Sequence, residues 1–107
     1  MTKETLELVA LDIQIERRRR NNQLLQAVQG ELDIYNLEDL MRGVAALEYA
    51  YNLAIELKYK YSEPAYITLV SQLSYAVVLS GEVNGDASKV LAILDRLFDD
   101  NSPASEG

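Results

Sequence analysis

The sequence predicts an all-α protein, a small four-helix bundle, and three observations lead to this prediction. Apolar residues recur at spacings of three and four along the chain, and no stretch alternates as a half-buried strand would. Of 107 residues, 49% are hydrophobic and 25% charged, which is typical of one globular domain. Only 2 prolines and 5 glycines occur, so disorder is expected only near the polar end. We therefore expect a single helical domain over residues 1–100 and a flexible tail over 101–107.

The first helix is expected over residues 3–29. Thr2 is a good N-cap because its hydroxyl can accept a backbone N–H, and Glu4 and Glu7 suit the positive end of the helix dipole. Gly30 is expected to end the helix, because glycine readily adopts the left-handed conformation found just past a helix end.

The segment ERRRRNNQ, residues 16–23, interrupts the apolar stripe of this helix. The helical spacing places Arg17 and Arg20 where apolar residues would face the core. Four consecutive residues fan over about 300° of a helix, so the arginines cannot all share one solvated side. Either the helix projects beyond the body of the protein here, or it breaks at Asn21 and Asn22, which are poor helix formers.

Two further amphipathic helices are expected over residues 37–61 and 87–99. The first carries two apolar stripes, which predicts packing against two neighbours, and Asn36 is its expected N-cap. It should end before Pro64, because proline disfavours helical backbone at the preceding residue. Asp86 is the expected N-cap of the last helix.

The remaining helix, expected over residues 64–80, contains no charged residue. It starts with a proline and should close on Gly81, following the usual preference of helix ends. We expect it to lie at the centre of the bundle, buried on most sides. An alternative is an interface helix, because its serines permit close approach and its tyrosines provide contact area. A membrane span is disfavoured by its length and its hydroxyl groups.

The charge of the chain is unevenly distributed. Residues 1–30 carry 5 basic and 4 acidic groups, a balance of +1, whereas residues 31–107 carry 5 basic and 13 acidic groups, a balance of −8. The sum is the formal net charge of −7. Such an acidic body repels nucleic acid and anionic lipid at long range and attracts basic surfaces.

The composition gives little support to catalysis. The chain has no cysteine and no histidine, so it lacks thiolate and imidazole groups for metal binding or nucleophilic and acid–base chemistry. No phosphate-binding loop or catalytic motif occurs. The carboxylate pairs Asp95/Asp99 and Glu48/Glu56 are expected to be solvated surface charges rather than Mg²⁺ ligands. We expect no enzyme activity, no cofactor and no metal site. The start lacks the pattern of a signal peptide, so a cytoplasmic protein is expected.

The run Arg17, Arg18, Arg19 and Arg20 is the first candidate interaction site. We expect it to act as an electrostatic clamp onto carboxylates of the same assembly, because burying guanidinium is costly without such partners. The candidate acids, which follow the turn at Gly30, are Glu31, Asp33, Glu38 and Asp39. An acidic external partner is the alternative. Phosphate contact is disfavoured, because no glycines or aromatics accompany the run and the rest of the chain is acidic.

Tyrosines form the second candidate site. Five of the 7 tyrosines fall between residues 49 and 66, and Tyr59 and Tyr61 alternate with lysines in the segment LKYKYSEPAY. The candidate interface residues are Tyr59, Tyr61, Tyr66 and Tyr75. The alternative is that they lie at the rim of the bundle, with rings inside and hydroxyls in water.

These observations predict a non-enzymatic, acidic helical protein-interaction module. It would bind and so block or regulate a basic surface of a partner protein, as inhibitors, immunity proteins and phage-type accessory proteins do. One alternative is a self-associating structural, adaptor or assembly-chaperone subunit, and a second is nucleic-acid contact through Arg17 to Arg20. We also expect a homo-oligomer, a dimer or higher, because 107 residues form a small core and the 64–80 helix has an uncharged face.

Overall fold

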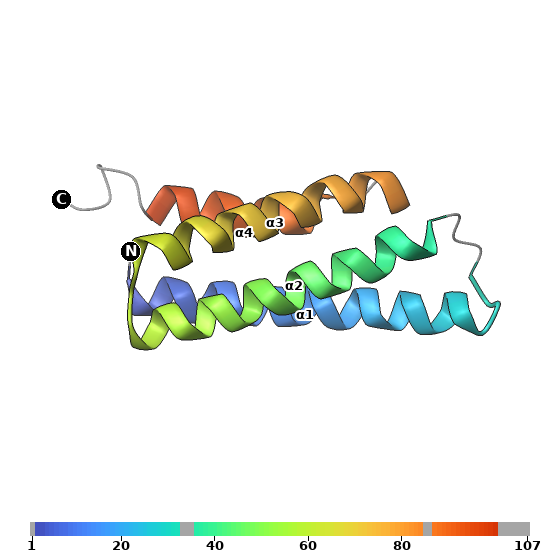
Figure 1. Cartoon of the computed structure of the whole chain (residues 1–107), viewed down its shortest axis with the longest axis horizontal. Coiled ribbons are helices and arrows are strands. Elements are labelled where there is room, and N and C mark those ends of the chain that lie inside the picture. Colours follow the sequence, from blue (N-terminus) through green and yellow to red (C-terminus); the bar gives the residue numbers. More distant parts are fainter. Residues whose placement is uncertain (1, 33–35, 85–86, 101–107) are drawn as a thin grey trace.

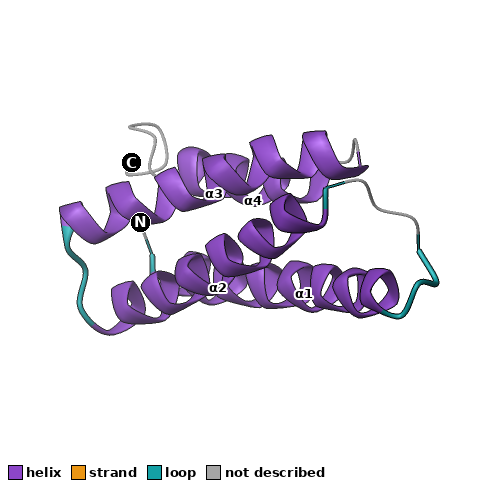
Figure 2. Cartoon of the chain, turned by 45° about the vertical axis from the view of Figure 1, so that its right-hand side comes forward, coloured by secondary structure: helices purple, strands orange, loops and turns teal. Residues whose placement is uncertain are grey.

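The computed structural model describes residues 2–32, 36–84 and 87–100, and within these ranges all regular structure is helical. This confirms the predicted all-α fold (Figure 1, Figure 2). The four helices are α1 (Lys3–Val28), α2 (Leu37–Tyr59), α3 (Glu63–Asn84) and α4 (Ser88–Asp100). The expected tail, 101–107, and Asp86, the expected N-cap of the last helix, lie outside the described residues.

The helices form an elongated bundle in which each runs opposite to the one before it (Figure 1). Its extents are 51 × 23 × 20 Å. α2 packs along both α1 and α3, as its two apolar stripes predict, and α4 packs against α1 and α3. α4 has 13 residues and α1 has 26, so α4 covers only part of α1. An ion pair between Arg96 Nη1 and Asp12 Oδ2, 2.6 Å apart, places α4 beside the N-terminal half of α1.

α1 is continuous through Arg17 to Asn22, so the break considered at the asparagines is absent. Its ends follow the sequence prediction. The Thr2 hydroxyl accepts a hydrogen bond from Thr5 N at 3.1 Å. At the other end Gly30 has φ +77°, and the N–H of Glu31 reaches back to the carbonyl of Gln26 at 2.8 Å. This backbone pattern satisfies carbonyls that the helix end would leave unpaired.

The boundaries around α3 differ from the prediction. α2 ends at Tyr59, and α3 begins at Glu63, with Pro64 in its first turn, where a missing N–H costs nothing. The expected stop at Gly81 is wrong, because α3 continues to Asn84. A glycine inside a helix costs only about 1 kcal/mol relative to alanine, which is too little to end a helix by itself. Asn36 occupies the N-cap position of α2, but its side chain makes no capping hydrogen bond.

α3 lies at a corner of the bundle, so the expectation of a central helix buried on most sides is wrong. Its core side carries Leu69, Leu73 and Ala76, all fully buried. The opposite side, which we call the α3 outer face, is exposed and uncharged, and consists of Ile67, Ser71, Ser74 and Val78. Four helices packed in pairs around one core leave each helix an outer face, whatever its composition. None of the helices in the described ranges is long and apolar enough to cross a membrane.

Candidate interaction surfaces

The arginine run contains one fully buried guanidinium group. The side chain of Arg20 is 1% exposed and that of Glu16, one turn earlier on α1, is 2% exposed. Arg20 Nε donates to Glu16 Oε1 at 3.1 Å, and Arg19 Nε donates to Glu16 Oε2 at 3.1 Å. Glu16 therefore accepts from two arginines within a single helix, and its charge compensates theirs inside the bundle.

The backbone of α2 makes room for this guanidinium group at Gly43. A Cβ atom at that position would lie 2.7 Å from Nη1 of Arg20 and 4.0 Å from Cβ of Leu79. Gly43 is buried in the N-terminal half of α2. A glycine there costs helix stability of about 1 kcal/mol relative to alanine, and the close approach of Arg20 explains why a side chain is absent.

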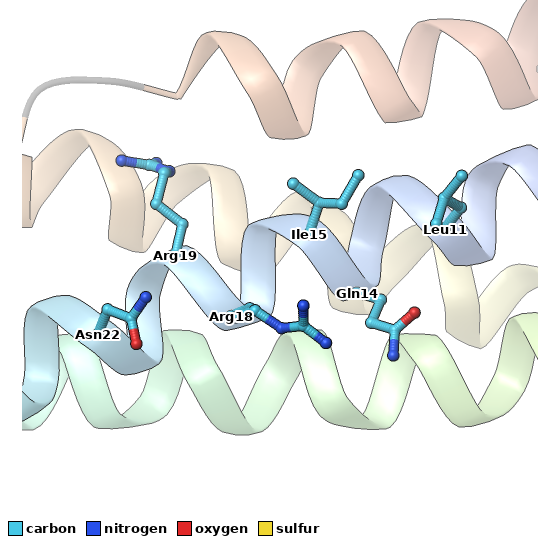
Figure 3. A pocket seen from close by; sticks show the side chains of 6 residues that line it. All are labelled: Leu11, Gln14, Ile15, Arg18, Arg19 and Asn22. Atoms are coloured by element: carbon cyan, nitrogen blue, oxygen red, sulfur yellow. The ribbon is translucent and has the colours of Figure 1, made fainter.

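The other two arginines have different surroundings. Arg17 is half-buried, and its guanidinium carbon lies 5.5 Å from the centroid of the Tyr51 ring on α2, which is a cation–π contact. Arg18 is exposed, and its side chain runs along the surface of α1 toward Gln14 (Figure 3). The four consecutive arginines thus divide among the interior, the α2 side and solvent, as the geometry of a continuous helix requires.

The carboxylate that receives Arg19 and Arg20 is Glu16, which is not one of the expected acids. Glu38 and Asp39 pair with Arg42 of their own helix, at 3.6 and 3.3 Å. Glu31 is exposed, and Asp33 lies outside the described residues. The sequence reasoning missed Glu16, although its spacing of three and four from Arg19 and Arg20 is the spacing at which helix side chains meet.

Burial by itself raises the pKa of the Glu16 carboxyl group, but the hydrogen bonds and positive charges of Arg19 and Arg20 outweigh it. The pKa of Glu16 is therefore held below its ordinary value of 4.5. A carboxyl whose pKa is lower in the folded than in the unfolded chain stabilises the fold above the unfolded-state pKa. That contribution is lost as the pH falls below 4.5 and through the lowered pKa.

We expect the stability difference between the wild type and Glu16→Gln to shrink as the pH falls from about 6 to about 3, because protonation removes the charge that the variant lacks. Urea unfolding at several pH values measures this difference. A difference that stays constant across the range would show that the Glu16 carboxyl does not titrate with folding.

The outward side of α1 carries a surface hollow lined by Leu11, Gln14, Ile15, Arg18, Arg19 and Asn22 (Figure 3). All six residues belong to one helix. Leu8, Leu11 and Ile15 are each about half exposed, and they follow one another at spacings of three and four. Exposed leucine and isoleucine in a continuous row are unusual on a soluble helix and indicate a contact surface.

The candidate tyrosines do not form one cluster. Tyr59 is 80% exposed at the end of α2, and Tyr61 is about half exposed in the turn that follows. The Tyr61 hydroxyl donates to Glu63 Oε2 at 3.1 Å, and partial burial together with this carboxylate raises the pKa of Tyr61. Tyr66 is 7% exposed and belongs to the core, with its ring 6.2 Å from that of Tyr61. It therefore offers little surface to a partner.

Tyr75 lies further along α3, in a shallow groove between α2 and α3. The groove is also lined by Tyr49 and Arg42 of α2. Tyr49 and Tyr75 are each about half exposed. The rings of Tyr49 and Tyr75 are thus partly buried and partly in contact with water, as expected for tyrosines at the rim of a bundle.

The outer side of α2 combines carboxylates with large exposed side chains. We call it the α2 outer face, and it consists of the exposed residues Glu38, Met41, Ala45, Glu48, Tyr49, Asn52, Glu56 and Tyr59. Arg42 lies at its edge, paired with Glu38 and Asp39. Tyrosine and methionine are enriched in protein interfaces, and the glutamates give the face a negative charge.

The paired acids do not gather into a metal site in the described ranges. Within residues 2–32, 36–84 and 87–100, no three acidic side chains lie close enough together to hold a metal ion. Glu48, Glu56, Asp95 and Asp99 are all exposed, as expected for solvated surface charge.

Comparison with known proteins found no family model that matches the chain, no significantly similar curated protein and no significantly similar solved structure. The functional argument therefore rests on the surfaces described above.

Proposed function

We propose that the chain is a non-enzymatic protein-interaction module of the cytoplasm, which binds and so blocks or regulates a basic surface of a partner protein. The observation that carries this proposal is the α2 outer face. It presents Glu48 next to the exposed Tyr49, and Glu56 about one turn before the exposed Tyr59. Carboxylates around aromatic side chains suit a partner that offers lysine or arginine, because the charges steer association and the rings supply contact area.

The net charge of −7 acts in the same direction, since it attracts basic surfaces over a longer range. Nucleic-acid contact is less well supported. Glu16 accepts hydrogen bonds from Arg19 and Arg20, and Arg17 lies over Tyr51. Of the four guanidinium groups, Arg18 is the most available to a phosphate.

Affinity capture with three immobilised versions of the protein tests the proposal: the wild type, Glu48→Lys with Glu56→Lys, and Asp95→Lys with Asp99→Lys. The two variants have the same net charge, but the second pair lies on α4. We expect a basic protein that binds the wild type and the α4 variant and is lost with the α2 variant. Its purified form should bind one to one in calorimetry and more weakly at high salt.

Equal capture by all three versions would contradict a role for the α2 outer face. If no protein binds the wild type in stoichiometric amounts, the interaction module itself is wrong. Circular dichroism of both variants controls for unfolding, because the four substituted side chains are exposed and their replacement should leave the helices intact.

A further inference from the structure

The outward side of α1 carries a row of residues at coiled-coil spacing, which we call the α1 seam and which the bundle leaves open. Its members follow the alternating spacing of four and three that defines the inward positions of a heptad: Glu4, Leu8, Leu11, Ile15, Arg18, Asn22 and Leu25. All seven are exposed in the bundle. The helix has a second row, including Leu6, Val9 and Ile13, which fills the core, so the open seam is additional to what the fold requires.

The hollow on α1 has the geometry of the holes that coiled-coil partners fill. A knob side chain enters a hole formed by four residues at positions i, i+3, i+4 and i+7 of the facing helix. Leu11, Gln14, Ile15 and Arg18 form one such set. The next set, one turn further, consists of Ile15, Arg18, Arg19 and Asn22. The hollow is therefore two consecutive holes of a single seam (Figure 3).

The charges along the seam are self-complementary when a second copy runs in the opposite direction. Glu4 lies at the N-terminal end, with Glu7 beside it, and Arg18 lies beyond the apolar middle. Antiparallel pairing places these carboxylates near Arg18 of the other copy, twice by symmetry. Parallel pairing would place Glu4 against Glu4 and Arg18 against Arg18, which is repulsive.

We propose that two copies of this chain associate through the α1 seam as an antiparallel helix pair, with the twofold axis between Leu11 and Ile15. Leu11 of one copy then enters the first hole of the other, and Leu8 enters the second. The aliphatic stem of Arg18 covers Leu8 of the other copy, while its guanidinium group reaches toward Glu4 and Glu7. This assembly does not depend on the proposed function, because it uses a different face.

The α3 outer face is a competing surface for self-association, because it too is exposed and, unlike the α1 seam, it carries no charge. Its residues include Ile67, Ser71 and Val78. Nothing on it distinguishes one partner orientation from another, whereas the α1 seam specifies a direction through charge and a register through its holes. A test must therefore compare the two faces.

The first test is sedimentation equilibrium of the full chain at tens of micromolar. This concentration is on the order of the dissociation constants of weak dimers. We expect a dimer for the wild type and for Ile67→Glu, and a dimer at least roughly tenfold weaker for Leu11→Glu, because a charge replaces a central contact of the seam. Unchanged helicity of Leu11→Glu verifies folding. A monomeric wild type, or dissociation by Ile67→Glu but not by Leu11→Glu, would overturn the proposal.

Charge exchange tests the antiparallel direction. Glu4→Lys and Arg18→Glu should each weaken the homodimer, by about tenfold at low salt, because each variant pairs like charges twice. An equimolar mixture of the two variants should form a heterodimer, since Lys at position 4 of one chain then meets Glu at position 18 of the other. Failure of the mixture to associate more tightly than either variant alone would rule out this arrangement.

Discussion

Replacing Glu16 with alanine is expected to lower the free energy of unfolding by about 3–5 kcal/mol, the range seen when one partner of a buried ion pair is removed. The physical reason is that Arg20, whose side chain is 1% exposed, would keep its charge in the interior without the carboxylate beside it. Arginine cannot escape by deprotonation, because its guanidinium group stays protonated in proteins. Urea unfolding near neutral pH measures the change.

Two further variants serve as controls for this experiment. Glu48→Ala removes an exposed glutamate and should change stability by no more than about 0.5 kcal/mol. Glu16→Leu combined with Arg20→Met removes the two fully buried charges and keeps apolar volume. Arg19 is 28% exposed and can turn to solvent, so the loss should be far smaller than for Glu16→Ala. If Glu16→Ala alone unfolds like the wild type, Glu16 is not the group that compensates the buried charge of Arg20.

Replacing Leu47 with alanine is expected to cost about 2–5 kcal/mol, because the side chain is fully buried and its removal leaves a cavity as well as losing apolar burial. Leu47 lies on α2, the helix that packs along both α1 and α3, so the cavity would affect the centre of the bundle. A domain of this size has a stability of only about 5–15 kcal/mol, so the variant should melt markedly earlier.

Met41→Ala is the matched control, because Met41 lies on the same helix and is about half exposed. Its removal should cost less than about 1 kcal/mol. If each substitution changes only the stability, the slope of the unfolding free energy against urea concentration should be the same in both variants as in the wild type. If Leu47→Ala and Met41→Ala lower the free energy of unfolding equally, Leu47 does not lie in the core.

Much of the fold could be predicted from local pattern. The spacing of apolar residues predicted four helices, and Thr2 and Gly30 predicted the ends of α1, because capping depends on a few neighbouring residues. The end of α3 could not be predicted from Gly81. Whether a helix passes through a glycine depends on packing elsewhere, which outweighs a local preference of about 1 kcal/mol.

The arginine run shows where sequence reasoning reached its limit. The spacing placed both Arg17 and Arg20 where apolar residues would face the core. Arg20 is buried there, whereas Arg17 is half-buried over Tyr51 of α2. The spacing could not decide which carboxylate receives a buried guanidinium group, because acids near in sequence and acids brought near by folding are equally plausible. The outward direction of the α1 seam could not be predicted from the sequence either. α1 carries apolar rows on two sides, and only the packing shows that the row containing Leu11 faces outward.

The contact between Arg20 and Gly43 has a consequence for how the sequence can change during evolution. A side chain at position 43 would collide with the guanidinium group, so the two positions are constrained as a unit. A lineage that shortens the residue at position 20 frees position 43 to acquire a side chain and gain helix propensity, whereas the reverse order passes through a clash. In related sequences, arginine at position 20 should therefore be accompanied by glycine at position 43. Larger residues should appear at position 43 only where position 20 is no longer arginine.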